Sequence, residues 1–378
     1  MKIQRTEPYL SEYLHAKRAR LGLPVAGNFE LTARCNFNCP MCYVHMSGSD
    51  IEKQGGELNA DEWLSIAEQA QKRGMVFVLL TGGEPLLRKD FFEIYEGMKK
   101  LGLLISINSN GSLIEGDILE RFAENPPFRF NISLYGSSDE TYMQMCKKPY
   151  FERVVNNIRK IKERGIDVRL NVSLTPCNCG DIEGIYRTAD ELGVHVKASS
   201  YMYPQIRPDI GADADSRMAP EEAARASVKC DTVRFSEEEF ISRAKALEKG
   251  ASDSGECAID SEEGVSCRAG SSSFWITWDG KMLPCGMMPA PAAYPLQVGF
   301  DRAWQTILDE TKKIRLPAEC AACPKRKMCR VCAAVCVTET GGYDKAPVYV
   351  CRMTDEIIRA SAQERERMES GSDKNKGE

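Results

Sequence analysis

Three cysteines occur close together near the N-terminus, in the segment CNFNCPMCY. Cys35, Cys39 and Cys42 are separated by three and then two residues. Three thiolates on one short loop can bind one iron–sulfur cube, whereas they cannot pair off among themselves. Clusters of the ferredoxin type normally have four cysteine ligands, so the fourth iron binds either a distant cysteine or a different molecule. A partial zinc site is the alternative that this spacing leaves open.

A second cysteine-rich segment, CAACPKRKMCRVCAAVC, lies far downstream. It contains two CxxC pairs and one further cysteine, at Cys320, Cys323, Cys329, Cys332 and Cys336. CxxC pairs bind zinc as well as iron, so the segment predicts metal ligation and leaves two zinc knuckles as the competing interpretation. The other candidate ligands in this half of the chain are Cys257, Cys267, Cys285 and Cys351.

The segment TGGEP, Thr81 to Pro85, is the third candidate for chemistry. Two glycines let backbone approach a ligand closely, exposed peptide groups can bind an amino group, and Glu84 offers a carboxylate. A tight turn with a solvated acidic residue is the plain alternative. Together with the cysteine loop, the segment predicts a ligand that is cationic at nitrogen.

Composition places these motifs in an ordinary globular chain. Its 378 residues allow one large core or two to three modest domains, and a net charge of -5 gives no reason to expect a nucleic-acid or membrane partner. The sequence has no signal-like apolar segment and no long apolar run, which predicts a cytoplasmic protein. In a reducing compartment, 16 cysteines with only three histidines favour thiolate metal sites over disulfides.

Alternating strands and helices must position the first two motifs. We expect strands at 28–33, 75–80, 103–108, 128–134, 166–174 and 194–199, and helices at 59–73, 89–101, 115–124, 150–164 and 181–192. This alternation predicts an α/β fold with a parallel sheet, either open or curled into a partial barrel. Ligands of such sheets bind at the C-terminal strand ends, where both the cysteine loop and TGGEP lie.

The pattern changes after residue 204. A loop and helix lead to a charged helix at 236–249, the linker-like segment SDSGECAIDSEEG and a hairpin that turns at Asp279 and Gly280. A helix at 355–367 and a disordered tail, SGSDKNKGE, are expected at the C-terminus. The predicted domains are a lead-in at 1–24, a barrel at 25–205, a bridging region at 206–260, a cysteine-rich domain at 261–355, and a helix with a tail at 356–378.

The two halves resemble known families. CNFNCPMC and GGEP, in this order on the first two strands, resemble the radical S-adenosylmethionine (SAM) superfamily. The cysteine-rich half resembles the SPASM extension through Cys267, the step from Gly280 to Cys285, the dense cluster at 320–336, and Cys351. The resemblance covers residues 25–355 and implies a partial (β/α)6 TIM-type barrel followed by a small SPASM domain.

The resemblance also implies roles for individual residues. Cys35, Cys39 and Cys42 would ligate a [4Fe-4S] cluster whose fourth iron binds the amino and carboxylate groups of SAM. No further catalytic residue is assigned. Glu84 and the two glycines before it would contact the amino group, Ser133 would contact the ribose, and Asn110 and Asn171 are looser candidates. The residues expected to contact SAM are Tyr43, Gly82, Gly83, Glu84, Asn110, Ser133 and Asn171.

Auxiliary [4Fe-4S] clusters are implied for the SPASM part. The ligands of one would be Cys320, Cys323, Cys329 and Cys351. Those of the other would include Cys267 and Cys285, with Cys257, Cys332 and Cys336 competing for the remaining places or leaving one iron open. The family commonly has its next cysteine three residues after the position of Cys329, whereas here the intervals differ. Four cysteines outside the pattern are expected to be buried, inert thiols: Cys146, Cys177, Cys179 and Cys230.

The implied reaction is reductive cleavage of SAM to a 5'-deoxyadenosyl radical that abstracts hydrogen from a substrate carbon. SPASM relatives mostly modify peptides, so the leading hypothesis is maturation of a ribosomally made peptide by oxidation or cross-linking. Formylglycine formation ranks second. The subgroup with that activity has an acidic residue directly after the cysteine of the Gly-x4-Cys step, whereas Gly286 follows Cys285 here. A small-molecule substrate such as a haem precursor, and a non-enzymatic electron carrier, are the other hypotheses. The expected partners are a peptide or protein substrate and an electron donor of the flavodoxin or ferredoxin type.

Overall fold

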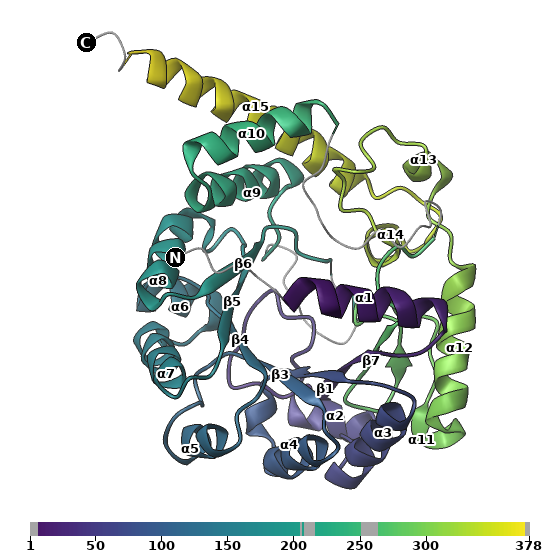
Figure 1. The fold of residues 1–378 in the computed structure, drawn as a ribbon. Coiled ribbons are helices and arrows are strands. Elements are labelled where there is room, and N and C mark those ends of the chain that lie inside the picture. The colour runs from purple at the N-terminus through teal and green to yellow at the C-terminus, as the bar shows by residue number, and fades with distance from the viewer. Residues whose placement is uncertain (1–6, 205, 208–215, 251–263, 375–378) are drawn as a thin grey trace.

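The computed structural model describes residues 7–204, 206–207, 216–250 and 264–374 (Figure 1). Its strands form one curved sheet in the order β6-β5-β4-β3-β2-β1-β7-β8. The first six strands are parallel and follow sequence order, which confirms the predicted partial barrel. They are β1 (Ala26–Thr32), β2 (Phe77–Gly82), β3 (Leu104–Ser109), β4 (Arg129–Ser133), β5 (Val168–Ser173) and β6 (His195–Ser199).

Helices follow these strands and cover the outer face of the sheet (Figure 1). The predicted ones are α3 (Ala60–Lys72), α4 (Phe91–Lys100), α5 (Gly116–Glu124), α7 (Phe151–Glu163) and α8 (Ile182–Leu192). Asn59 caps α3 in a capping box with Glu62, as its sequence position predicts. Within the barrel, the short helices α2 (Gly48–Lys53) and α6 (Asp139–Cys146) were not predicted, and each begins after a serine cap.

The two faces of the sheet have different side chains because successive strand residues point to opposite sides. Toward the helices the strands present fully buried apolar residues, namely Phe29, Leu80, Ile107, Phe130 and Leu170. The inner wall carries polar residues. There Asn131 Nδ2 donates to Asn108 Oδ1 at 2.9 Å, and Asn108 Nδ2 donates to Thr81 Oγ1 at 3.3 Å. The inside of the barrel is therefore a polar surface suited to a bound molecule.

The predicted hairpin extends this sheet on the side of β1. Strand β7 (Ser273–Ile276) pairs parallel with β1, and β8 (Met282–Leu283) pairs antiparallel with β7. The N-terminal helix α1 (Glu7–Arg20) is tied to the start of β7, where His15 Nδ1 lies 2.8 Å from Ser272 Oγ. The cysteine-rich half is thus joined to the barrel through its sheet. The expected linker before it lies almost entirely outside the described residues.

The remaining helices lie on either side of the cysteine-rich region, and none in the described part of the chain is long and apolar enough to cross a membrane. Two short 3-10 turns also occur, at Pro85–Leu87 and Cys179–Asp181. The helices are α9 (Pro220–Arg234), α10 (Glu237–Glu248), α11 (Pro295–Val298), α12 (Phe300–Lys313), α13 (Ala318–Ala321), α14 (Ala333–Thr340) and α15 (Val348–Lys374).

The C-terminal tail differs from the prediction. The chain is helical through Lys374, so the first residues of the expected disordered tail belong to α15. The reason is packing that the local sequence does not reveal. Arg365 of α15 forms ion pairs with Glu248 of α10 at 3.0 Å and with Glu369 at 2.5 Å, and α15 lies alongside α9 and α10 (Figure 1).

Candidate functional site

The cysteine loop leaves the C-terminal end of β1, and its three cysteines are half-buried. Backbone N–H groups point at two of the sulfurs. Phe37 N donates to Cys35 Sγ at 3.4 Å, and His45 N donates to Cys42 Sγ at 3.3 Å. Hydrogen bonds of this kind stabilise thiolates, the form in which cysteine binds metal.

The surroundings of these sulfurs fit an iron–sulfur cube. Burial raises the pKa of the Cys35 thiol to about 12 and that of Cys39 well above its usual range. Iron is therefore the charge partner that would hold these groups as thiolates. Each cysteine of a cube binds a different iron, so the sulfurs need not converge on one point. Among the described residues, no three Cys, His, Asp or Glu side chains do so.

The two glycines of TGGEP are explained by close contact with the strand that carries the cysteine loop. A Cβ atom on Gly82 would lie 2.3 Å from Thr32 O, and one on Gly83 would lie 2.2 Å from Arg34 O. Hydrogen bonds continue the pairing of the two strands, from Gly83 N to Thr32 O and from Glu84 N to Arg34 O, both at 2.8 Å. Only glycine lets these backbones approach so closely.

Glu84 is fully buried and bonded within the protein. Its carboxylate accepts hydrogen bonds from Asn110 N at 2.8 Å, Ser109 Oγ at 2.9 Å and Leu86 N at 3.2 Å. Burial raises its pKa to about 7, against the lowering effect of these donors. The side chain therefore ties the end of β2 to the end of β3, a role that comes in addition to the predicted contact with SAM.

The predicted polar residues at the other strand ends are placed differently. The amide of Asn110 reaches the cysteine loop, where Nδ2 donates to Asn36 Oδ1 at 2.8 Å and lies 3.9 Å from Cys35 Sγ. Ser133 and Asn171 are partners in the register of β4 and β5. The structure thus brings Asn110 to the sulfurs, whereas the other two lie together farther along the inner wall.

Tyr135 is a site residue that the sequence analysis missed. Tyr135 and Cys39 are electrostatic neighbours, and the Tyr135 ring packs against Phe37 at a centroid distance of 6.1 Å. Burial, followed by the three cysteines, raises the pKa of Tyr135 well above its usual range, so the hydroxyl remains a donor. An aromatic residue two positions after Ser133 at a strand end was the available signal.

A buried ion pair lies beside the predicted aromatic residue Tyr43. Glu30 of β1 is fully buried, and its carboxylate accepts one hydrogen bond from each of the two terminal guanidinium nitrogens of Arg207, both at 2.8 Å. It also accepts the indole N–H of Trp275 at 3.1 Å. The Arg207 guanidinium carbon lies 6.0 Å from the centre of the Tyr43 ring. The pair thus connects the bridging region and the hairpin to the cysteine loop.

The described cysteines of the C-terminal half separate into two groups by their electrostatic neighbours. One group contains Cys267, Cys285 and Cys332, and Tyr203 is an electrostatic neighbour of all three. The other group contains Cys320, Cys323, Cys329 and Cys351.

Cys336 lies between the two groups. It is fully buried, and burial, followed by Cys320, Cys332 and Cys329, raises its pKa to about 12. Cys257 lies outside the described residues. The grouping resolves the sequence ambiguity in part, because Cys332 lies with Cys285 rather than with Cys329.

The four cysteines outside the pattern have different environments. Cys146 and Cys230 are buried as expected, and Cys146 donates to Tyr142 O at 3.1 Å. Cys179 is half-buried and Cys177 is exposed, so the expectation of burial is wrong for Cys177. The reason is its place in the turn after β5, where only its backbone is engaged, through Thr175 Oγ1 at 3.2 Å.

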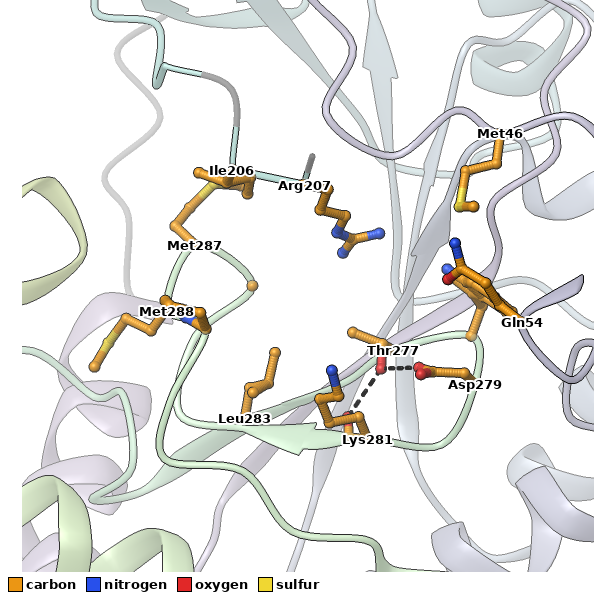
Figure 2. A pocket seen from close by; sticks show the side chains of 13 residues that line it. Met46, Gln54, Ile206, Arg207, Thr277, Asp279, Lys281, Leu283, Met287 and Met288 are labelled. Atoms are coloured by element: carbon orange, nitrogen blue, oxygen red, sulfur yellow. Dashed lines mark hydrogen bonds between the residues drawn. The ribbon is translucent and has the colours of Figure 1, made fainter. Parts of the chain in front are cut away.

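A cavity of about 280 Å³ lies between the cysteine loop region and the hairpin (Figure 2). Its volume is slightly below the usual range for ligand pockets, which begins at about 300 Å³. Arg207 borders it, and so does Gly286, which directly follows Cys285. The lining residues are Met46, Gln54, Ile206, Arg207, Thr277, Trp278, Asp279, Lys281, Leu283, Gly286, Met287, Met288 and Pro289.

Comparison with known proteins supports this description. Residues 29–189 match the model of the Radical SAM superfamily. An AdoMet-dependent heme synthase of Methanosarcina barkeri is 26% identical over 332 residues, which cover 83% of this chain and 93% of that protein. A protein described as a probable GTP 3',8-cyclase, from Saccharolobus solfataricus, is 34% identical over 179 residues, which cover 47% of this chain and 56% of that protein.

Solved structures share the fold at low sequence identity. Native anSMEcpe with bound AdoMet is 16% identical, with a TM-score of 0.67 over 92% of this chain and 100% of that chain. Streptococcus suis SuiB bound to its precursor peptide SuiA is 16% identical, with a TM-score of 0.66 over 92% of this chain and 82% of that chain. Since the family match contains the cysteine loop and TGGEP, the protein carries a radical SAM domain, whose cofactors are a [4Fe-4S] cluster and S-adenosylmethionine.

Proposed function

We propose that the protein is a radical SAM oxidoreductase that abstracts hydrogen from a carbon of a peptide and leaves it oxidised or cross-linked. The observation that carries the peptide assignment is the cavity of about 280 Å³ beside the inner wall. It can hold one or two side chains, and the Gln54 amide on its lining is of a type that both donates and accepts hydrogen bonds, as backbone peptide groups do. A macrocycle would need a larger cavity.

The protein's own residues bind and orient the reacting molecules. When bound, the cluster and SAM supply the radical that removes hydrogen from the substrate. Cys35, Cys39 and Cys42 would hold the cluster, with Tyr135 as a neighbour and backbone N–H groups directed at the sulfurs. Gly82, Gly83 and Glu84 would bind the amino group of SAM, with Tyr43, Asn110, Ser133 and Asn171 as further contacts.

The two downstream cysteine groups would hold auxiliary clusters. Cys320, Cys323, Cys329 and Cys351 supply four ligands, whereas Cys267, Cys285 and Cys332 supply three, with Cys257 or Cys336 as the fourth. Burial raises the pKa of Cys285 to about 11, so this thiol also requires a metal partner to be ionised. We further propose an external donor of the flavodoxin or ferredoxin type, and the cytoplasm as the compartment that keeps these thiols reduced.

A haem precursor is the second candidate substrate. It is favoured by the similarity to the heme synthase, which extends over 93% of that protein. Formylglycine formation is a weaker candidate, because the likeness to anSMEcpe is one of fold and Gly286 follows Cys285 in this chain.

Isotope transfer tests the proposal. The reconstituted chain would be reduced anaerobically with SAM and incubated with pools of perdeuterated peptides encoded near its gene. We expect deuterium in 5'-deoxyadenosine and a peptide that has lost hydrogen. Cys39→Ala should abolish 5'-deoxyadenosine formation, whereas Cys230→Ala, which changes a buried cysteine outside the site, should retain it.

Two results would contradict the proposal. Absence of 5'-deoxyadenosine from protein with an intact first cluster would exclude the enzymatic reaction. Deuterium transfer from a labelled haem precursor, but from none of the peptides, would replace the first candidate substrate with the second.

A further inference from the structure

The cavity is built on the part of the sheet that the hairpin adds to the barrel. In the strand register, Asn28 of β1 is opposite Trp275 of β7, which is opposite Leu283 of β8. Thr277 N donates to Lys281 O at 3.0 Å, so these two residues are also opposite each other. Because strand side chains alternate between faces, Lys281 and Leu283 share the face of Trp275 and Glu30. The cavity therefore continues the inner wall on which Glu30 lies.

Lys281 is the cavity's cation without a described counter-ion. Its ammonium group forms no ion pair within 4.0 Å and no hydrogen bond among the described residues. Arg207 is neutralised by Glu30, and Asp279 accepts a hydrogen bond from Thr277 Oγ1. Figure 2 shows the Lys281 ammonium directed into the cavity, across from the Arg207 guanidinium. A half-buried ammonium in this position attracts an anion.

Most of the remaining lining is apolar, apart from Gln54 and Thr277. Met287, Met288, Leu283 and Ile206 lie on one side of the cavity (Figure 2), and Trp278 also lines it. Methionine side chains adapt their shape to different apolar partners. The cavity thus combines an apolar surface with the Lys281 ammonium, and the Asp279 carboxylate lies on the same lining without an ion pair to Lys281 within 4.0 Å.

We infer that this cavity is a specificity subsite, which binds an apolar side chain next to a carboxylate of the substrate, and that Lys281 is the carboxylate's partner. The inference rests on the proposed function, and the occupant it commits to is an acidic residue of the peptide. The cavity shares no lining residue with the predicted SAM contacts, so the carboxylate of SAM is not the anion in question.

Retention of capped tetrapeptides tests the subsite without turnover. The reconstituted full chain, saturated with SAM, would be immobilised without reductant. An equimolar pool of peptides would be applied that differ only in Leu-Glu or Leu-Gln at the centre, and the bound fraction quantified by mass spectrometry. We expect about tenfold enrichment of the Glu peptides, the effect of one charge-assisted hydrogen bond. Lys281→Gln should remove the enrichment, whereas Lys72→Gln, on the exposed face of α3, should not.

Further measurements separate the possible results. The iron content and the thermal midpoint of Lys281→Gln should match those of the wild-type chain, which shows that the variant is folded and loaded. Equal retention of the Glu and Gln peptides by the wild-type chain, or enrichment that survives Lys281→Gln, would overturn the subsite while leaving the peptide proposal standing. Lys281-dependent retention of a dicarboxylate without peptide bonds, but of no peptide, would support the anion site and count against the peptide.

Discussion

Arg207 and Glu30 form a bidentate ion pair on the inner wall, with both nitrogen–oxygen distances at 2.8 Å. The carboxylate is fully buried, whereas one-fifth of the Arg207 side chain is exposed. Arginine matches this geometry through its planar fork, and Trp275 satisfies one carboxylate oxygen further. The pair is therefore a rigid connection between the bridging region and the strand that leads to the cysteine loop.

Removing the Arg207 side chain should lower the free energy of unfolding more than removing the charge of Glu30. We expect Arg207→Ala to lower the free energy of unfolding by about 3 kcal/mol, because it leaves Glu30 buried without a counter-ion. Glu30→Gln should cost less, since the partly exposed Arg207 can be hydrated. Denaturant unfolding of the cluster-free chain measures both changes.

The control for this comparison is an exposed ion pair. Lys72→Ala, which removes the partner of Glu68 on α3, should change stability by less than about 0.5 kcal/mol. If Arg207→Ala behaves like Lys72→Ala, the buried pair does not hold the bridging region on the barrel.

The raised pKa of Glu84 predicts a dependence of stability on pH. The pKa in the folded chain is about 7 and the ordinary value is 4.5, so the unfolded chain loses this proton first as the pH rises. The contribution of Glu84 to the free energy of unfolding therefore falls by about 3 kcal/mol in total between about pH 4.5 and pH 7. Above pH 7 this contribution is constant. The thermal midpoint of the cluster-free chain should decline over this range relative to Glu84→Gln, whose amide does not titrate. If the thermal midpoints of the wild-type chain and of Glu84→Gln change in parallel with pH, the raised pKa of Glu84 is ruled out.

Iron content should separate the two downstream cysteine groups. Cys323→Ala and Cys351→Ala should each lose the same cluster, about four irons per chain, because both residues lie in the second group. Cys285→Ala and Cys332→Ala should both lose the other cluster. Iron and sulfide analysis after anaerobic reconstitution measures these losses. Cys230→Ala should retain all of the iron, and additive losses in a Cys285→Ala/Cys332→Ala double variant would mean that these residues serve different clusters.

The local sequence was sufficient to predict the alternating strands and helices of a parallel sheet and the cysteine loop after its first strand, whereas the partial barrel was implied by the family resemblance. Helix α3 illustrates the reason: its cap at Asn59 and its apolar positions from Trp63 to Ala70 repeat at helical spacing, and both signals are local. The two glycines of TGGEP were predicted to let the backbone approach a ligand closely. In the structure they let it approach the backbone of Thr32 and Arg34.

Relations between distant segments were decided only by the tertiary structure. Arg207 meets Glu30 across 177 positions, and Tyr135 reaches Cys39 from another strand end, so no local pattern reports either contact. Burial by such neighbours also raises the pKa of Glu84, and the packing of α15 against α10 through Arg365 and Glu248 accompanies a helix that continues to Lys374. The sequence by itself determined which cysteines and strand-end residues we predict to carry the chemistry, because spacing and periodicity are properties of the chain. Which of them lie together depended on packing between elements far apart along it.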